Sequence, residues 1–468
     1  MSDDEKLSEE NTKRLDYLEE LLDEVERNTL VDRLSLSADV RVTMNNYLYR
    51  ELSPEKNTDY GLIRENGETI GAWNIRGRIK MSSMLGDSFK LTAWLSMYKQ
   101  FLESSPDRYN SVSITPYYDG SRGQYPSDSR VYMERLYVDW FITDWLAFSA
   151  GRSSTVGGPP SEIRYDSVRL GTFAESIISS PLDGVYLAFD LDTIFGMKNS
   201  LFRLYYVPRL FMNDVDIPNN LFVSEKNPLQ FVYGGQLDME IPGLRNSNFM
   251  LQIAHLPELK GNSPDADMDG DGQPDEFFVS YSMGNILMLN ANLTVPRIFT
   301  LPLDVYAAFN YIMVKTPLRD EKNPDRGFIG ISDEDGNTTP LFSLLGNNLS
   351  GSVLHGFMGY GGVRYNFPFT LNHISPKLGV DFNYGSPNHY SFHSPDTTGL
   401  NRFAIRGVHG EAYGIIPVHR KANIRLCYVY QRHFHTPDLF LPVGENRSNV
   451  PEIDEIIHNW NIMLNIYF

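Results

Sequence analysis

The sequence predicts an all-β fold in which about sixteen antiparallel strands close into a membrane-spanning barrel. Three observations predict it: apolar residues at every second position, connections that alternate between short and long, and the pattern of the last strand. In that strand, 458–468, apolar residues alternate with amides: Trp460, Ile462, Leu464, Ile466 and Phe468 against Asn459, Asn461 and Asn465. Because the side chains of a strand point to two opposite faces, this segment has one apolar and one polar wall. Its length matches the roughly 9–11 residues of a membrane-crossing strand.

The composition of the 468 residues is compatible with a barrel and excludes several other classes. No stretch approaches the roughly 18–20 apolar residues of a transmembrane helix, which excludes a helical membrane protein. Barrel strands need only half a stripe of apolar residues, and 27 Tyr and 27 Phe can supply aromatic girdles at both membrane interfaces. The single cysteine, Cys427, excludes a disulfide framework and covalent haem attachment, so we expect no haem. The net charge of −18 argues against nucleic acid as a partner.

Residues 1–30 form the first of two predicted domains, a short helical segment. Between residues 6 and 29 the chain has neither Pro nor Gly. Its apolar residues are spaced as the a and d positions of a heptad: Leu15, Leu18, Leu22 and Val25. A helix this short is marginal alone, so its seam must pack against something. We favour a short self-associating coiled coil, and the alternative is a single amphipathic helix lying on the barrel. The chain starts without a basic and apolar leader, so we expect that a secretory signal has been removed.

Residues 31–468 form the second predicted domain, the barrel. Its first strand has a face of apolar residues: Leu34, Leu36, Ala38, Val40, Val42 and Met44. Polar residues between Arg33 and Asn45 occupy the other face. Similar alternations begin at Trp73, Phe89, Leu136, Leu146, Val185, Phe202, Leu237, Phe249, Leu287, Val305, Phe357, Val380, Phe403 and Ile424, before the final strand. A period of two residues is typical of strands and is not produced by a helix.

The connections between these strands alternate in length. Short connections are expected at 84–87, 142–144, 193–197, 242–245, 296–302, 368–376 and 416–417. Long polar connections are expected at 51–67, 103–129, 153–182, 212–228, 257–276, 316–350, 386–400 and 436–454. Transmembrane barrels have this asymmetry, with short periplasmic turns and longer outer loops. It also places both ends of the barrel on the short-turn side.

The end of the chain resembles a known signal. A last strand that contains Trp460 and ends in Tyr467 and Phe468 resembles the membrane-insertion signal of bacterial outer-membrane barrels. The whole chain resembles a porin-like outer-membrane family of Gram-negative bacteria in which a coiled coil precedes the barrel. Many members of such families have no assigned function. Two further segments support the likeness, the junction 27–37 and the stretch from Gly151 to Pro160.

The resemblance implies a location, partners and a function. It implies the bacterial outer membrane, with periplasmic termini and contacts to membrane lipid and lipopolysaccharide. It also implies a homotrimer and a water-filled barrel through which small hydrophilic solutes or ions diffuse. No catalytic signature such as Gly-x-Ser-x-Gly, a P-loop or HExxH is present, so we do not expect an enzyme. Two alternatives stay open: a barrel that sheathes a partner such as a multihaem cytochrome, and a structural envelope protein.

The parity of the strands predicts which charges face the interior, because Lys or Arg on the lipid face costs about 2–4 kcal/mol at mid-membrane. The inward cations are Arg33, Arg41, Arg76, Arg78, Lys80, Arg402, Arg406, Lys421 and Arg425. In general porins the third long loop folds into the barrel and narrows it. By resemblance, we expect the loop acids Glu162, Asp166 and Glu175 to face Arg41, Arg76, Arg402, Arg406 and Arg425 across a constriction. The alternative is that these arginines only pair with wall acids such as Asp39, Asp139, Asp190 and Asp238.

One long loop carries a calcium-like motif. Residues 265–276 match D-x-D-x-D-G-x5-E, with oxygen ligands from Asp265, Asp267, Asp269, Asp271, Asp275 and Glu276. Calcium is a hard cation that takes six to eight oxygen ligands, and the Gly at the sixth position permits the turn. Prolines in and around the motif argue against a helix–loop–helix hand. We therefore expect Ca²⁺ to order a surface loop, and the alternative is a solvated hairpin tip.

Overall fold

The computed structural model describes the chain from Leu34 to Phe468 with gaps. The described residues are 34–52, 66–100, 131–179, 181–209, 231–259, 277–279, 283–322, 326–332, 338–347, 349–393, 400, 402–436, 440–442, 450 and 452–468. The predicted N-terminal helix, with its seam of Leu15, Leu18, Leu22 and Val25, lies outside them. So does the calcium-like motif at 265–276.

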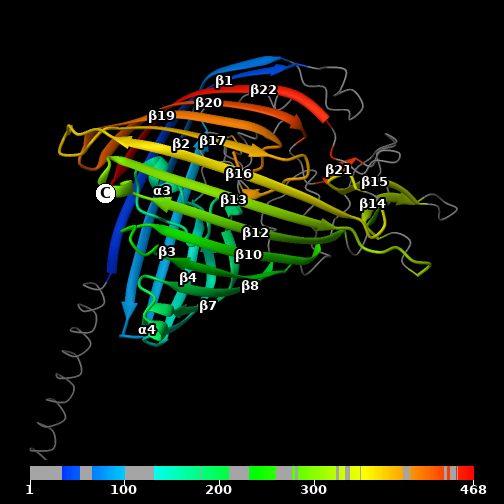
Figure 1. Ribbon diagram of the computed structural model, residues 1–468, viewed down its shortest axis with the longest axis horizontal. Coiled ribbons are helices and arrows are strands. Elements are labelled where there is room, and N and C mark those ends of the chain that lie inside the picture. Colours follow the sequence, from blue (N-terminus) through cyan, green and yellow to red (C-terminus); the bar gives the residue numbers. More distant parts are fainter. Residues whose placement is uncertain are drawn as a thin grey trace, which may run out of the picture.

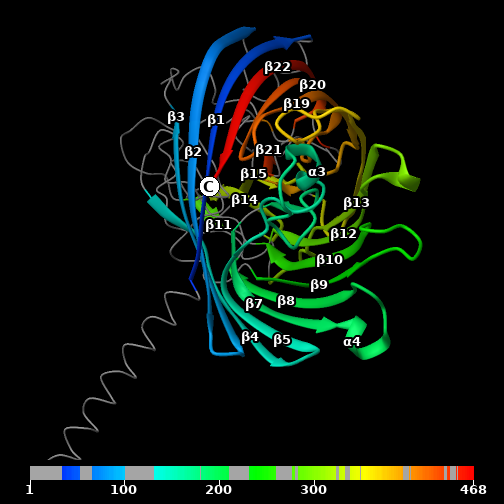
Figure 2. The same cartoon turned by 90° about the vertical axis from the view of Figure 1, so that its left-hand side faces the viewer.

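Sixteen antiparallel strands form one closed barrel (Figures 1 and 2). They are β1 (Leu34–Glu51), β2 (Gly67–Leu85), β3 (Phe89–Gln100), β4 (Val131–Thr143), β5 (Leu146–Ser154), β7 (Pro181–Asp190), β8 (Leu201–Arg209), β9 (Val232–Met239), β10 (Asn248–Leu259), β12 (Gly284–Val295), β13 (Leu303–Lys315), β16 (Val353–Asn366), β17 (Lys377–Gly385), β19 (Gly407–His419), β20 (Ala422–His435) and β22 (Glu452–Tyr467). Each pairs with the next along the chain, and β22 closes the barrel on β1. The predicted fold class is confirmed.

The pairing of β22 with β1, which closes the barrel, shows which side chains face inward and which face outward. Across it Thr43 pairs with Met463, and both side chains are fully buried inside. On the alternate positions of the same strand, Trp460 and Ile462 are 46% and 44% exposed on the outer surface. A strand in a closed wall must turn alternate side chains to opposite sides, so the apolar stripe of each strand lies outside and its polar stripe inside.

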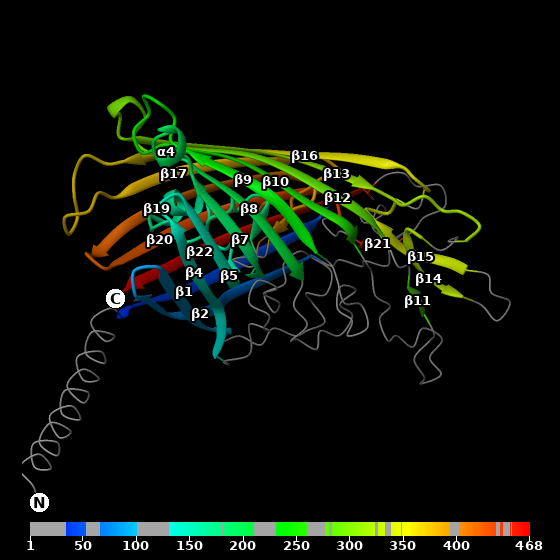
Figure 3. The same cartoon turned by 90° about the horizontal axis from the view of Figure 1, so that it is seen from below.

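The two ends of the barrel differ. The backbone N–H of Tyr467 donates to the carbonyl of Lys421, so the C-terminus lies beside the turn between β19 and β20. At the opposite end, three long connections contribute to a small four-stranded sheet (Figure 3). Its strands are β11 (Phe277–Val279), β14 (Phe328–Ser332), β15 (Thr338–Leu344) and β21 (Phe440–Pro442). Short turns and long loops therefore occupy opposite ends, as the sequence predicts. The helices outside the strands are α3 (Ser161–Tyr165), α4 (Leu191–Phe195) and the 3-10 turn η3 (Ile298–Thr300). None of the described helices is long and apolar enough to span a bilayer.

One predicted strand is wrong. The sequence predicts that Phe403 and Ile405 face lipid, but both lie in the connection between β17 and β19 and are fully buried. The strand here is Gly407–His419, and the following turn is at 420–421 instead of 416–417. Phe403 packs inside the barrel against Tyr360 of β16, with ring centroids 5.1 Å apart. An apolar side chain is buried equally well by lipid and by a packed lumen, so periodicity alone did not distinguish the two.

The connection between β5 and β7 folds into the barrel (Figure 2). We call its described residues, 155–179, the inner loop. It contains α3, and its strand β6 (Ile178–Ser179) pairs in parallel with β18 (Phe392–His393) from another long connection. Apolar residues of the inner loop join the largest buried cluster together with inward-facing residues of the wall: Phe173, Ala174, Ile177 and Ile178 with Met250, Ile286 and Ile312. Part of the barrel interior is thus a packed core.

Candidate functional site

Arg164 anchors the inner loop to the barrel wall. It lies on α3, which follows Pro160 and ends at Asp166, a residue in the left-handed conformation. Its guanidinium is fully buried, and Nε donates to Asp381 on β17 at 3.1 Å. Its Nη2 donates to both carboxylate oxygens of Glu411 on β19, at 3.1 and 3.0 Å. Such bidentate, charge-assisted contacts are the strong ones in proteins, and their geometry fixes the position of α3 against this wall.

Glu411 is the centre of a buried ionic cluster. It also accepts from Arg402 at 2.8 Å and from Arg425 of β20. The Arg425 Nε donates to the backbone carbonyl of Arg164 at 3.2 Å. The Tyr165 ring lies 4.4 Å from the Arg41 guanidinium carbon, which brings the closing seam into the same cluster. Buried charges are tolerated only when they are paired and hydrogen-bonded, so this cluster depends on having all of its members.

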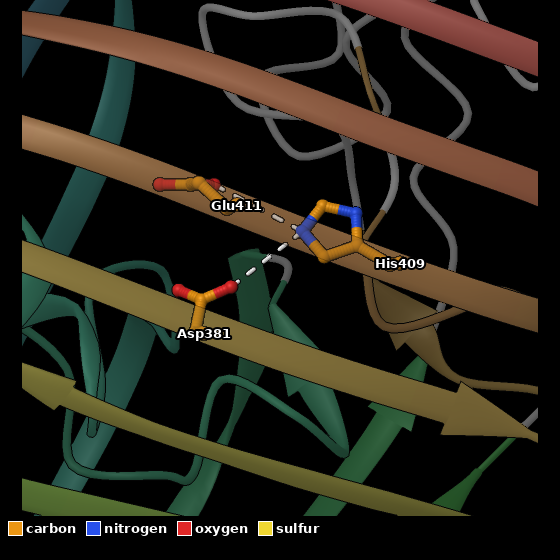
Figure 4. A group of neighbouring side chains, drawn as sticks. All are labelled: Asp381, His409 and Glu411. Atoms are coloured by element: carbon orange, nitrogen blue, oxygen red, sulfur yellow. Dashed lines mark ion pairs between the residues drawn. The ribbon is translucent and has the colours of Figure 1, made fainter.

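Three buried ligand-type residues lie together in this cluster (Figure 4). The Nε2 of His409 lies 3.7 Å from Asp381 and 3.9 Å from Glu411. Their spacing would suit a metal ion, but Glu411 already accepts hydrogen bonds from Arg164, Arg402 and Arg425. A divalent cation would add two positive charges beside three guanidinium groups and only two carboxylates. We therefore assign these residues to the ionic cluster and not to a metal centre.

The predicted constriction residues occupy this region, and several have partners other than those expected. Asp166 pairs with Arg364 of β16 at 3.4 Å and with Lys377. Glu175 lies 3.9 Å from Arg164. Among the predicted arginines, Arg76 pairs with Asp39 at 3.2 Å, and Arg41 donates to Asn465 at 2.7 Å. Arg402 and Arg425 contact Glu411, and Arg406 donates to the carbonyl of His389 at 2.7 Å.

Glu162, the third predicted acid, lies on α3. One of its carboxylate oxygens is buried with no hydrogen-bond partner in the described part of the chain. Burial raises the pKa of this carboxyl, because the charged form loses its hydration.

A cavity in the lumen lies along a different wall. A cavity of about 420 Å³ runs between the inner loop and strands β4, β5, β7 and β8. Its charged lining residues are Arg135, Asp139, Asp144, Asp190 and Arg203, and the inner loop contributes Leu170 and Thr172. Aromatic side chains, among them Tyr137 and Tyr186, also face it. A lining that mixes apolar and aromatic side chains with a few charged groups is typical of sites that contact small molecules.

Two more arginines hold the edge of the inner loop beside this cavity. Arg135 of β4 donates to the carbonyls of Leu170 and Val156, at 2.6 and 3.0 Å. Arg169 of the loop donates to Asp238 at 2.9 Å, and the same carboxylate accepts from Arg203 of β8 at 3.3 Å. The loop is therefore fixed on both sides, and the cavity lies between the loop and the wall.

The sequence analysis did not identify several of these residues. Arg135 and Arg203 follow the same parity rule as the predicted cations, so the signal for them was present. Asp381 also alternates with outward-facing Val380 and Phe382. Glu411 was missed because its strand was displaced in the prediction. For Arg164, one arginine in a polar loop, the sequence carries no signal.

The closed wall of sixteen strands, apolar outside and polar inside, defines a porin-like β-barrel of the outer-membrane type. Residues 68–218 match the model of a family described as "Protein of unknown function (DUF3373)". No curated protein matches the sequence.

Solved porin structures are similar over most of the chain at low identity. OprB of Pseudomonas putida is 11% identical, with a TM-score of 0.49, over 95% of this chain and 96% of that one. OmpF of Salmonella typhi, solved in complex with daunomycin, is 8% identical with a TM-score of 0.44, over 92% and 97% of the two chains. An anion-selective porin from Comamonas acidovorans is 8% identical with a TM-score of 0.42, over 93% and 99%.

Proposed function

We propose that this protein is an outer-membrane channel for the passive diffusion of small hydrophilic solutes or ions, narrowed by the inner loop. The observation that carries the proposal is the cavity of about 420 Å³ between that loop and strands β4 to β8. A closed barrel alone does not make a channel, since side chains can fill it. Here a cavity with charged groups in its lining lies beside a firmly anchored loop, which supports a passage at this place. The termini face the periplasm in this proposal, and three barrels assemble as a trimer.

The solute meets charges on the β4–β8 side of the loop. Arg203 and Asp139 both line the cavity from the wall, so opposite charges border one narrow space. Fixed charges in such a passage select solutes by charge and dipole. Glu162, Asp166 and Glu175, together with Arg41, Arg76, Arg402, Arg406 and Arg425, bound the constriction from the other side. The members of this set that contact the loop hold it in position, and the others pair within the wall and its connections.

Ion selectivity in planar bilayers tests this proposal. Purified protein should give stepwise openings. Arg203→Gln should move the reversal potential in a salt gradient toward cations, and Asp139→Asn should move it toward anions. The matched control is Arg432→Ala, because Arg432 pairs with Asp454 on the outer surface and should not affect selectivity. A folded protein that stays silent, or two variants that keep the original selectivity, would contradict the proposal.

A sheath for an electron-carrying partner is the second candidate. Such a sheath needs a lumen wide enough to admit a folded protein. The inner loop argues against it, because Phe173, Ala174 and Ile177 are buried in a core shared with the wall. Conductance that appears only after a co-purified partner is removed would favour the sheath over the open channel. Persistent silence without any partner would favour a structural envelope protein.

A further inference from the structure

Three histidines on the outer surface each contact a tyrosine of a neighbouring strand through Nδ1. The pairs are His255–Tyr233 at 2.7 Å, His355–Tyr311 at 2.6 Å and His458–Tyr428 at 2.8 Å. Their rings are also in contact, with centroids 5.2, 5.9 and 6.1 Å apart. The same device therefore occurs on three separate strand pairs, β9–β10, β13–β16 and β20–β22.

On β22 and β16 the histidine lies at a similar position relative to the outward apolar residues of its strand. On β22 the outward apolar stripe runs from Trp460 to Phe468, a separation of eight residues. His458 is the next outward residue toward the long loops, and Ile456 follows it. On β16 the stripe runs from Phe357 to Tyr365, also a separation of eight residues. His355 is the next outward residue, and Val353 at the start of the strand follows it. Eight tilted residues span about 20 Å, close to the apolar band of an outer-membrane barrel.

Beyond such a band lie the lipid headgroups, so these two histidines lie at headgroup level on the long-loop side. His255 lies in the same half of its strand, four residues before β10 ends at Leu259.

Each tyrosine fixes the protonation of its histidine. A phenol hydroxyl is a stronger donor than acceptor, so it donates to Nδ1, and the neutral ring then carries its proton on Nε2. The Nε2–H is left as a hydrogen-bond donor on the outer surface. A donor held at headgroup level needs an acceptor there, and lipid headgroups offer phosphate oxygens.

Cations flank two of the three pairs. Lys315 on β13 is exposed and pairs in register with Val353, two residues before His355. Arg50 on β1 is exposed and pairs with Ile456, two residues before His458. Both therefore lie on the same face and at the same end of the barrel as the histidines. Positive charge beside a fixed N–H donor is the combination that binds a phosphate group.

We propose that the three His–Tyr pairs are binding sites for phosphate-bearing lipid headgroups of the outer leaflet. The proposal rests on the outer-membrane placement in the proposed function, and not on conduction. The lipid contributes phosphate oxygens, the histidine Nε2–H donates to them, and the tyrosine keeps the imidazole in the donating form.

Lipid binding to the full-length protein in detergent, counted by native mass spectrometry, tests this proposal. The probes are phosphatidic acid and diacylglycerol with the same acyl chains, which differ only in the phosphate. The wild type should retain phosphatidic acid in preference to diacylglycerol. The triple variant H255F, H355F, H458F keeps an aromatic ring at each site but removes the donors. Its affinity for phosphatidic acid should fall by about threefold for each site lost.

The controls separate folding and conduction from binding. H419F changes an exposed histidine at the short-turn end and should leave binding unaltered. The triple variant Y233F, Y311F, Y428F keeps the three histidines but removes the hydroxyls that fix their tautomer. Its loss of affinity for phosphatidic acid should be smaller. Heat-modifiable migration in gels verifies that each barrel is folded. Bilayer conductance should be the same in all of these variants, so failure of the channel proposal is recognised independently.

Two results would overturn the proposal: equal retention of diacylglycerol and phosphatidic acid, or undiminished phosphatidic acid in the histidine triple variant. Displacement of the lipid by millimolar inorganic phosphate would indicate a soluble-anion site instead and would overturn the lipid assignment.

Discussion

Arg164 is the residue on which the position of the inner loop most depends. It is fully buried and shared between Asp381 and Glu411. Removing one partner of a buried ion pair leaves an uncompensated charge and typically costs about 3–5 kcal/mol. We expect Arg164→Ala to release the inner loop while the barrel stays closed. Hydrogen exchange of residues 155–179 should speed up markedly, with little change in β1 and β22.

An exposed ion pair provides the matched control for Arg164. Arg432 and Asp454 form a bidentate pair on the outer surface, with distances of 2.9 and 3.0 Å. Exposed pairs are worth about 0–1 kcal/mol, so Arg432→Ala should leave loop exchange as in the wild type. Equal protection of the inner loop in the Arg164 and Arg432 variants would show that the ionic cluster does not anchor it.

His389 gives the connection between β17 and β19 a pH dependence. Its ring is buried, its Nε2 lies 2.8 Å from the carbonyl of Phe403, and burial lowers its pKa to about 4. In an opened connection the pKa returns to about 6.5. Between these values the open form takes up a proton that the closed form does not. Closure is therefore most stable above about pH 6.5 and weakens as the pH falls toward about 4.

Exchange of residues 386–393 and 402–406 measured from pH 7 to pH 4.5, corrected for intrinsic rates, checks this expectation. Protection should decrease as the pH falls in the wild type. His389→Gln removes the titrating group and should flatten the profile. A wild-type profile as flat as that of the variant would rule out His389 as its source.

For single strands, the most predictable property was which side chains face the interior of the barrel and which face outward. Strand parity correctly predicted that Asp39, Arg41, Arg76 and Arg78 face the interior, because charge on the lipid face is costly. It failed where the outer face of a strand is small. On β19 that face includes Gly410, Ala412 and Gly414, so no apolar stripe identified it. The nearby Phe403 and Ile405 gave a stronger but misleading alternation, since they belong to the packed interior.

Calcium binding by the segment 265–276 remains a prediction, because these residues lie outside the described part of the chain. We expect the EDTA-treated protein to bind Ca²⁺ with millimolar or tighter affinity through Asp265, Asp267, Asp269, Asp271, Asp275 and Glu276. Isothermal titration should show this heat in the wild type. Asp267→Asn with Asp269→Asn should abolish it, because two of the charged ligands are lost. Asp333→Asn with Asp335→Asn changes another acidic loop and is the matched control. The absence of binding heat in the wild type would contradict the predicted calcium site.

For the barrel as a whole, the position of the cavity could not be predicted from the sequence. Parity predicted inward charges on several strands, yet the wall that the inner loop covers is decided by contacts between residues far apart in the chain. Arg164 reaches Asp381 and Glu411, more than two hundred residues later. Once α3 lies against β17 and β19, the predicted basic wall is covered, and the described cavity lies beside the charges of β4 to β8 instead.

We expect the last residue of the chain to control assembly of the whole barrel in the membrane. Phe468 exchanges two backbone hydrogen bonds with Ala38, and its ring is 64% exposed on the outside. A side chain that contacts so little of the protein adds little to the stability of the folded barrel. We therefore expect Phe468→Ala to reduce the amount of barrel assembled in the outer membrane several-fold. After refolding in detergent, the same variant should unfold at nearly the wild-type temperature.

The exposed Phe299 of the turn between β12 and β13 is the matched control for Phe468. It is 74% exposed, so Phe299→Ala removes a similar aromatic surface from the barrel without changing the last strand. Membrane-assembled protein should remain at the wild-type level in this control. If Phe468→Ala assembles equally well, or if its purified barrel melts far below the wild type, the terminal aromatic acts through stability or not at all. It would then not be an insertion signal.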